Sequence, residues 1–119
     1  MKKEMQNPCL SIDVRWRKIR IHRTTLKLLH HPEYIVILVN PELRTMAVIS
    51  SEEITTAHRV NWSRLRKTYE LTSKSLVQNL CGLCPEWKEG GTYRITGVYK
   101  GNGNVAEFNL EEAEIVRRS

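Results

Sequence analysis

The stretch HHPEYIVILV, residues 30–39, has a degenerate counterpart later in the chain, GLCPEWKEGGTYRITGVY, residues 82–99. In both stretches Pro-Glu precedes an aromatic residue, and the two matches lie 53 residues apart. The segments just upstream, KIRIHRTTLKLL (18–29) and TYELTSKSLVQNL (68–80), also match, at an offset of 50 residues. The same order of features in both halves predicts an internal repeat.

The first copy has the pattern of a strand, a helix and a hairpin. Isoleucines alternate with basic residues over 18–22, which predicts a half-buried strand with a basic outer face. Thr24 or Thr25 can cap a short helix, and the proline of the Pro-Glu pair ends it. A dense apolar run over 34–39 and a return over 45–49 then predict a hairpin.

The second copy repeats this pattern with a longer helix. Apolar and polar residues alternate over 68–72, and Thr72 or Ser73 can cap the helix that follows. Strands are predicted over 93–99 and 105–110, joined by a Gly-Asn-Gly-Asn turn that tolerates positive φ.

The length of 119 residues suits one domain, and 40% hydrophobic residues are enough for a core. We divide the chain into an N-terminal arm (1–14), a first β-α-β-β half (15–50), a connection (51–63), a second β-α-β-β half (64–112) and a C-terminal tail (113–119).

No targeting or membrane-spanning segment is predicted. The lysines near the start are not followed by an apolar segment, and the longest apolar run, 35–39, is far shorter than a membrane span. Three cysteines do not form the paired framework of a secreted protein. We therefore expect a soluble, cytoplasmic protein that does not bind membranes.

The net charge of +6 is concentrated in two short segments. Residues 11–27 hold six basic residues against Asp13, a net +5, and residues 59–74 hold five against Glu70, a net +4. The rest of the chain therefore carries a net −3. A solvated charged face is the plain interpretation, but arginines clustered on two related segments favour a polyanion-binding surface. The candidate nucleic-acid-binding residues are Arg15, Arg17, Lys18, Arg20, Arg23, Lys27, Arg64, Arg66, Lys67 and Lys74.

Each basic segment also holds a tryptophan that precedes the first strand of its half, Trp16 and Trp62. An exposed indole can stack on a nucleic-acid base. Large aromatic residues are more often part of a core, so we expect both to be buried.

A basic strand, a short helix and a hairpin, in this order, resemble the swapped-hairpin half-barrel of AbrB-like transition-state regulators, in the double-copy arrangement of MraZ-like proteins. The resemblance implies a strand-rich α/β fold in which two tandem β-α-β-β repeats form one pseudo-two-fold swapped-hairpin barrel. It implies a non-enzymatic, bacterial-type transcription regulator that binds double-stranded DNA through the first strands and the segments entering the helices. It implies no cofactor and leaves a homo-oligomer open. The chain departs from the family pattern where Pro-Glu replaces Gly-Asp before each hairpin.

The two halves are not expected to contribute equally to DNA binding. At the offset of 50, Arg20 falls opposite Glu70 and Arg23 opposite Ser73. Because glutamate repels phosphate, the first half is expected to dominate. The alternative function is a protein-interaction adaptor whose basic patch binds an acidic partner.

Cys81 and Cys84 form a C-x-x-C pair at the end of the second predicted helix. A structural zinc site needs about four ligands, so a site would require His31 or His30 and the distant Cys9 as well. A thioredoxin-type role needs the pair at a helix N-terminus, which is the opposite end. We favour a packing role and predict no metal. The chain has no P-loop and no G-x-G-x-x-G, and no catalytic constellation is recognisable.

Overall fold

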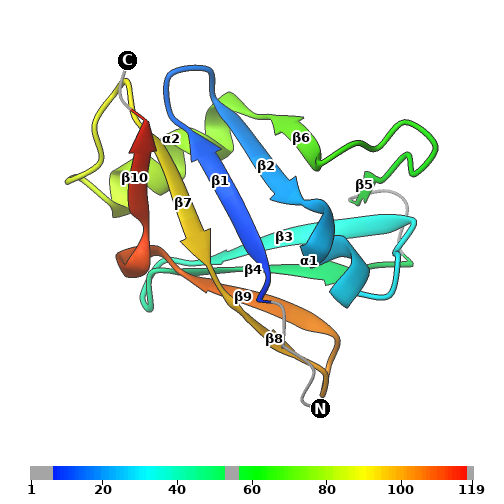
Figure 1. Cartoon of the computed structure of the whole chain (residues 1–119). Coiled ribbons are helices and arrows are strands. Elements are labelled where there is room, and N and C mark those ends of the chain that lie inside the picture. Colours follow the sequence, from blue (N-terminus) through cyan, green and yellow to red (C-terminus); the bar gives the residue numbers. More distant parts are fainter. Residues whose placement is uncertain (1–6, 53–56, 118–119) are drawn as a thin grey trace, which may run out of the picture.

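A computed structural model describes residues 7–52 and 57–117. The fold is strand-rich, with two five-stranded antiparallel sheets and few helices (Figure 1). The first sheet has the order β10 (Glu114–Arg117), β7 (Thr92–Thr96), β1 (Cys9–Asp13), β2 (Lys18–His22) and β6 (Thr68–Thr72). The second has the order β5 (His58–Arg59), β3 (Tyr34–Asn40), β4 (Thr45–Ser50), β9 (Val105–Asn109) and β8 (Val98–Lys100). The helices are α1 (Arg23–Leu28), α2 (Lys74–Leu83) and the 3-10 turn η1 (Leu110–Glu112).

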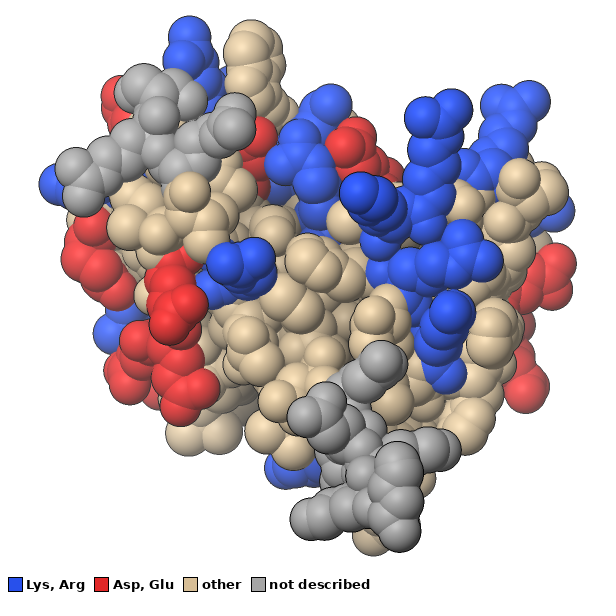
Figure 2. All heavy atoms as spheres, in the orientation of Figure 1, with Lys and Arg blue, Asp and Glu red and all other residues tan. Residues whose placement is uncertain are grey.

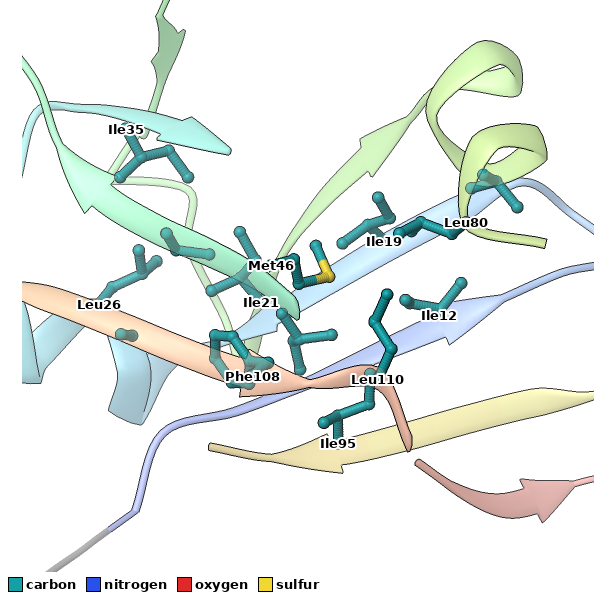
Figure 3. Packing of buried hydrophobic residues seen from close by; sticks show 14 of the residues in the cluster. Ile12, Ile19, Ile21, Leu26, Ile35, Met46, Leu80, Ile95, Phe108 and Leu110 are labelled. Carbon is teal, nitrogen blue, oxygen red and sulfur yellow. The ribbon is translucent and has the colours of Figure 1, made fainter. Parts of the chain in front are cut away.

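The core lies between the two sheets and is closed by the helices (Figure 3). Alternation along the strands explains its composition, since every second side chain of a strand points to the same face. Ile19 and Ile21 of β2 are fully buried, while Lys18, Arg20 and His22 between them are only partly covered. Leu80 of α2 and Phe108 of β9 are also fully buried and belong to the same core (Figure 3).

Gly97 joins the two sheets. It separates β7 from β8, so one continuous stretch of chain leaves the first sheet and enters the second. Its amide donates to the carbonyl oxygen of Pro8 at 2.8 Å. A Cβ at this position would meet the carbonyl oxygen of Glu107 and lie 2.6 Å from Cδ2 of Phe108, so only glycine fits. Neither sheet closes on itself.

The predicted order of elements occurs twice. Strand β2, helix α1 and the hairpin β3–β4 are followed by β6, α2, β7 and the hairpin β8–β9. The single strand predicted over 93–99 is wrong, because Gly97 divides it into β7 and β8, which belong to different sheets. The halves pair at two places, β2 with β6 and β4 with β9, both antiparallel. Arg20 pairs with Glu70 at the centre of the first contact, and Ala47 pairs with Glu107 at the centre of the second.

Strands outside the two repeats were not predicted from the sequence. Within the segment assigned as an N-terminal arm, Cys9–Asp13 forms β1, which lies between β2 and β7. Leu10 and Ile12 of this strand are fully buried. The C-terminal tail contributes the edge strand β10, which pairs with β7. Residues 1–6, 53–56 and 118–119 of the predicted arm, connection and tail lie outside the described residues.

The helix starts follow the prediction in one half only. Ser73 is the N-cap of α2, and its hydroxyl accepts from the amide of Leu76 at 3.2 Å. The predicted threonine cap of α1 is wrong, because this helix begins earlier, after His22, with no side-chain cap. Thr25 instead lies buried inside α1, where its hydroxyl accepts from the amide of Cys9 at 2.7 Å and donates to the Cys9 carbonyl at 2.9 Å. The hydroxyl therefore ties α1 to the start of β1.

Candidate nucleic-acid interface

The two segments that carry the excess positive charge lie side by side. Strand β2 pairs with β6 along its whole length. Where that pairing ends, the amide of Arg23 donates to the carbonyl oxygen of Lys67 at 2.8 Å. Figure 2 shows Lys and Arg side chains gathered at the upper right of the molecule, the region that β2, β6 and the segment before β6 occupy in Figure 1. We call the surface formed by residues 15–23 and 64–67 the basic surface.

The cations of β2 are already paired with carboxylates. Nε of Arg20 lies 2.9 Å from Glu70 and its Nη1 lies 3.4 Å from Asp13, while Nζ of Lys18 lies 3.4 Å from Glu70. The hydrogen bond from Arg20 holds the pKa of the Glu70 carboxyl below its usual value, and the same bond raises the pKa of Arg20. These contacts reduce the positive field over the outer face of β2.

Arg23 has a structural position in the basic surface. Its guanidinium donates to the carbonyl oxygens of Leu65 and Arg66, at 3.0 and 3.2 Å, and lies 5.8 Å from the centre of the Trp62 ring. The side chain therefore fixes the segment that precedes β6 against the start of α1. The partial negative charges of the two carbonyl oxygens offset part of the positive charge of this guanidinium.

The segment before β6 carries three unpaired cations among the described residues. The side chains of Arg64, Arg66 and Lys67 are exposed and form no ion pair or hydrogen bond with other described residues. Together with Thr68 and Glu70 they line a surface groove beside β6. Free cations on one side of a groove are suited to contact an anion such as phosphate.

The turn between β1 and β2 adds an exposed aromatic residue between two arginines. Trp16 is 62% exposed, which contradicts the expectation that it belongs to the core. The Arg15 guanidinium lies 5.4 Å from the centre of the Trp16 ring, and the backbone amide of Trp16 donates to the Asp13 carboxylate at 3.1 Å. Arg17 follows with a φ of 55° and is exposed. An indole and two arginines at a turn tip can contact a base and the flanking phosphates.

Trp62 and the remaining predicted lysines lie elsewhere. Trp62 is half-buried against the core, as expected, and its indole nitrogen donates to the Pro32 carbonyl at 2.7 Å. Lys27 lies in the last turn of α1 and Lys74 begins α2. Both are exposed, and their side chains have no hydrogen-bond or ion-pair partner among the described residues. They lie on helices rather than on the paired strands.

The C-x-x-C pair ends α2, as predicted. Cys84 is fully buried and Cys81 half-buried, and burial raises the pKa of both thiols. A thiol with a raised pKa is a poor nucleophile at neutral pH. His31, the third residue of the metal alternative, packs on the Trp62 ring with centroids 4.7 Å apart. Within residues 7–52 and 57–117, no three His, Cys, Asp or Glu side chains are grouped to hold a metal ion.

Arg44 links the end of α2 to the first hairpin and was not foreseen from the sequence. It lies in the β3–β4 turn with a φ of 54°. Its guanidinium donates to Glu86 at 3.0 Å and to Glu111 at 3.2 Å. No local sequence signal identifies this residue, because its partners come from distant parts of the chain.

No family model, curated protein or solved structure matches the chain. No helix of the described residues is long and apolar enough to cross a membrane.

Proposed function

We propose that this protein is a non-enzymatic, double-stranded DNA-binding protein that acts as a transcription regulator and uses the basic surface to contact phosphates. The observation that carries the proposal is the meeting of both basic segments across the β2–β6 pairing, with Arg64, Arg66 and Lys67 left exposed and unpaired among the described residues. Such cations supply most of the affinity of a protein for DNA because phosphate contacts release condensed counterions.

The contacts of these cations support a different ranking from the one expected from the sequence. Arg20 and Arg23 are engaged with carboxylates and carbonyls, whereas the arginines and lysine before β6 are free to move toward a ligand. We therefore expect the second basic segment to contribute more than the first, with Trp16 and its flanking arginines as a second contact point. Glu70 lowers affinity locally, because its charge opposes phosphate.

A swapped-hairpin arrangement of the two halves is part of the same proposal. Residues that are equivalent at the repeat offset, Arg20 and Glu70, pair with each other, which is expected when a pseudo-two-fold axis passes between them. Each hairpin turn also reaches the end of the other half's helix. Asn104 donates to the Leu29 carbonyl after α1 at 3.2 Å, and Arg44 donates to Glu86 after α2 at 3.0 Å.

Duplex binding is tested by fluorescence anisotropy with a labelled random duplex, the matching single strand, an RNA duplex and an acidic polypeptide such as polyglutamate. A DNA-binding protein should prefer the DNA duplex over polyglutamate at equal ionic strength. An adaptor for acidic proteins should show the reverse order. Binding of every polyanion with the same affinity would mean that the basic surface acts only as a diffuse charge, and it would refute a specific role in DNA binding.

A further inference from the structure

The outer edge of β6 has backbone groups without a neighbouring strand. The amide of Ser73 donates to the Arg17 carbonyl at 3.0 Å, and the amide of Arg23 donates to the Lys67 carbonyl at 2.8 Å. In an antiparallel pair of strands, residue pairs that exchange backbone hydrogen bonds alternate with pairs that do not. These two bonds lie at the two ends of the β2–β6 pairing, so the backbone N–H and C=O groups of the odd-numbered residues from 67 to 73 face β2. The N–H and C=O groups of Thr68, Glu70 and Thr72 therefore point away from the sheet. Among the described residues, no strand pairs with this edge.

The first half of the chain has a strand at the equivalent place, and the second half nearly lacks one. Strand β1 precedes β2 in the chain and pairs with it on the side opposite β6. Its counterpart by chain position is β5, which precedes β6 but is only two residues long and pairs with β3 alone. Within residues 7–52 and 57–117, one side of β6 therefore carries no paired strand, whereas β2 is paired on both sides.

The groove at this edge selects for negative charge. It is lined by Arg64, Arg66 and Lys67, which precede β6, and by Thr68 and Glu70 of the strand itself. Glu70 is held by Lys18 and Arg20, which offset part of its charge, and the three cations of the groove outnumber its single carboxylate. The free cations of the groove therefore face any segment that lies along the edge.

We propose that the free edge of β6 docks an acidic, extended segment of a partner protein, which adds to the first sheet as a sixth strand. Outward-facing backbone donors and acceptors at every second residue recognise another extended backbone, as in other strand-addition complexes. The groove cations then select acidic side chains on one face of that strand. Recognition by the backbone edge is a property that duplex DNA does not share, so the proposal stands independently of DNA binding.

The probe is a synthetic eight-residue peptide of alternating glutamate and valine, titrated into the isotope-labelled full chain and followed by amide hydrogen exchange. At a free peptide concentration ten times its Kd, the amides of Thr68, Glu70 and Thr72 should exchange about tenfold more slowly, because only the unbound fraction exchanges. The amides that already face β2 should change less. A peptide with lysine in place of glutamate should bind at least about tenfold more weakly.

A matched pair of variants separates edge recognition from charge attraction. Thr68→Pro removes one outward N–H at the first residue of an edge strand, where proline is tolerated. Thr68→Val keeps the N–H and is the control. We expect the proline variant to bind the acidic peptide about tenfold more weakly than the valine variant, while both bind duplex DNA equally.

The proposal is overturned if the peptide binds without slowing the three edge amides, or if the two variants bind it equally. It is also overturned if no binding is detected at millimolar peptide. Slowing of the same amides by duplex DNA but not by the peptide would assign the groove to nucleic acid instead. If Thr68→Pro fails to fold, as judged by amide chemical-shift dispersion, the protection measured on the parent chain still decides the question.

Discussion

Replacing Gly97 by alanine should destabilise the protein strongly, because this residue forms the bend between the two sheets. The added Cβ would meet the Glu107 carbonyl oxygen and lie 2.6 and 2.8 Å from two ring carbons of Phe108. The ring is fully buried, and Glu107 lies in β9 between β4 and β8, so neither neighbour can move aside freely. Overpacking of this kind costs typically 1–3 kcal/mol, and we expect about 3 kcal/mol here.

Thermal and urea unfolding followed by circular dichroism measure this effect. For a domain of this size, 3 kcal/mol corresponds to a fall in Tm of roughly 12 °C. Gly82→Ala is the matched control, since a Cβ there has no atom within 4 Å and the residue lies exposed in α2. That change should stabilise the protein by about 0.5–1 kcal/mol. A Gly97→Ala protein as stable as the parent would show that the bend does not need glycine, and the packing argument would fail.

Three further variants test the charges and the cysteines. Glu70→Gln releases Arg20 and removes a negative charge, so duplex affinity measured by anisotropy should rise, and an unchanged or lower affinity would contradict the reading of this ion pair. Burial lowers the pKa of His22, so the unfolded chain takes up a proton first as pH falls through about 6.5. Stability is therefore complete above that pH and declines below it, and His22→Gln should lose less stability than the parent between pH 7.5 and 5.5 in urea titrations. Equal losses in both proteins would exclude His22 as the cause. Replacing Cys81 and Cys84 together by serine should retain the fold at a cost of about 1–3 kcal/mol in chemical denaturation, and stoichiometric zinc that the parent holds and the variant loses would refute their packing role.

The repeat was predictable because it is carried by local signals. Alternating apolar residues predicted β2 and β6, and a serine N-cap predicted the start of α2. The offset of 50 aligned Arg20 with Glu70 as equivalent positions of the repeat, but it did not predict that the two pair across β2 and β6. Such features depend on residues close in sequence, which a pattern can record.

Features that depend on tertiary contacts were not predictable. Strand β1 lies outside the repeat that the sequence reveals, and its stability comes from partners on both sides, β2 and β7. The hydroxyl of Thr25 is used by Cys9, sixteen residues away, and not by the helix. The two hydrogen bonds from the Arg23 guanidinium to backbone carbonyls likewise involve a segment more than forty residues away in the sequence. Which cations remain free for a ligand is therefore decided by the fold and not by composition.

The salt dependence of duplex binding tests the proposed function most directly. Log affinity should fall linearly with log salt concentration, with a slope of about −0.9 for each phosphate contacted. Arg66→Gln with Lys67→Gln should flatten that slope by up to about two units. Lys88→Gln with Lys100→Gln changes the net charge equally, outside the two basic segments, and should leave the slope nearly unchanged. Equal slopes in all three proteins, or no salt-sensitive duplex binding by the parent, would contradict a DNA-binding role for the basic surface.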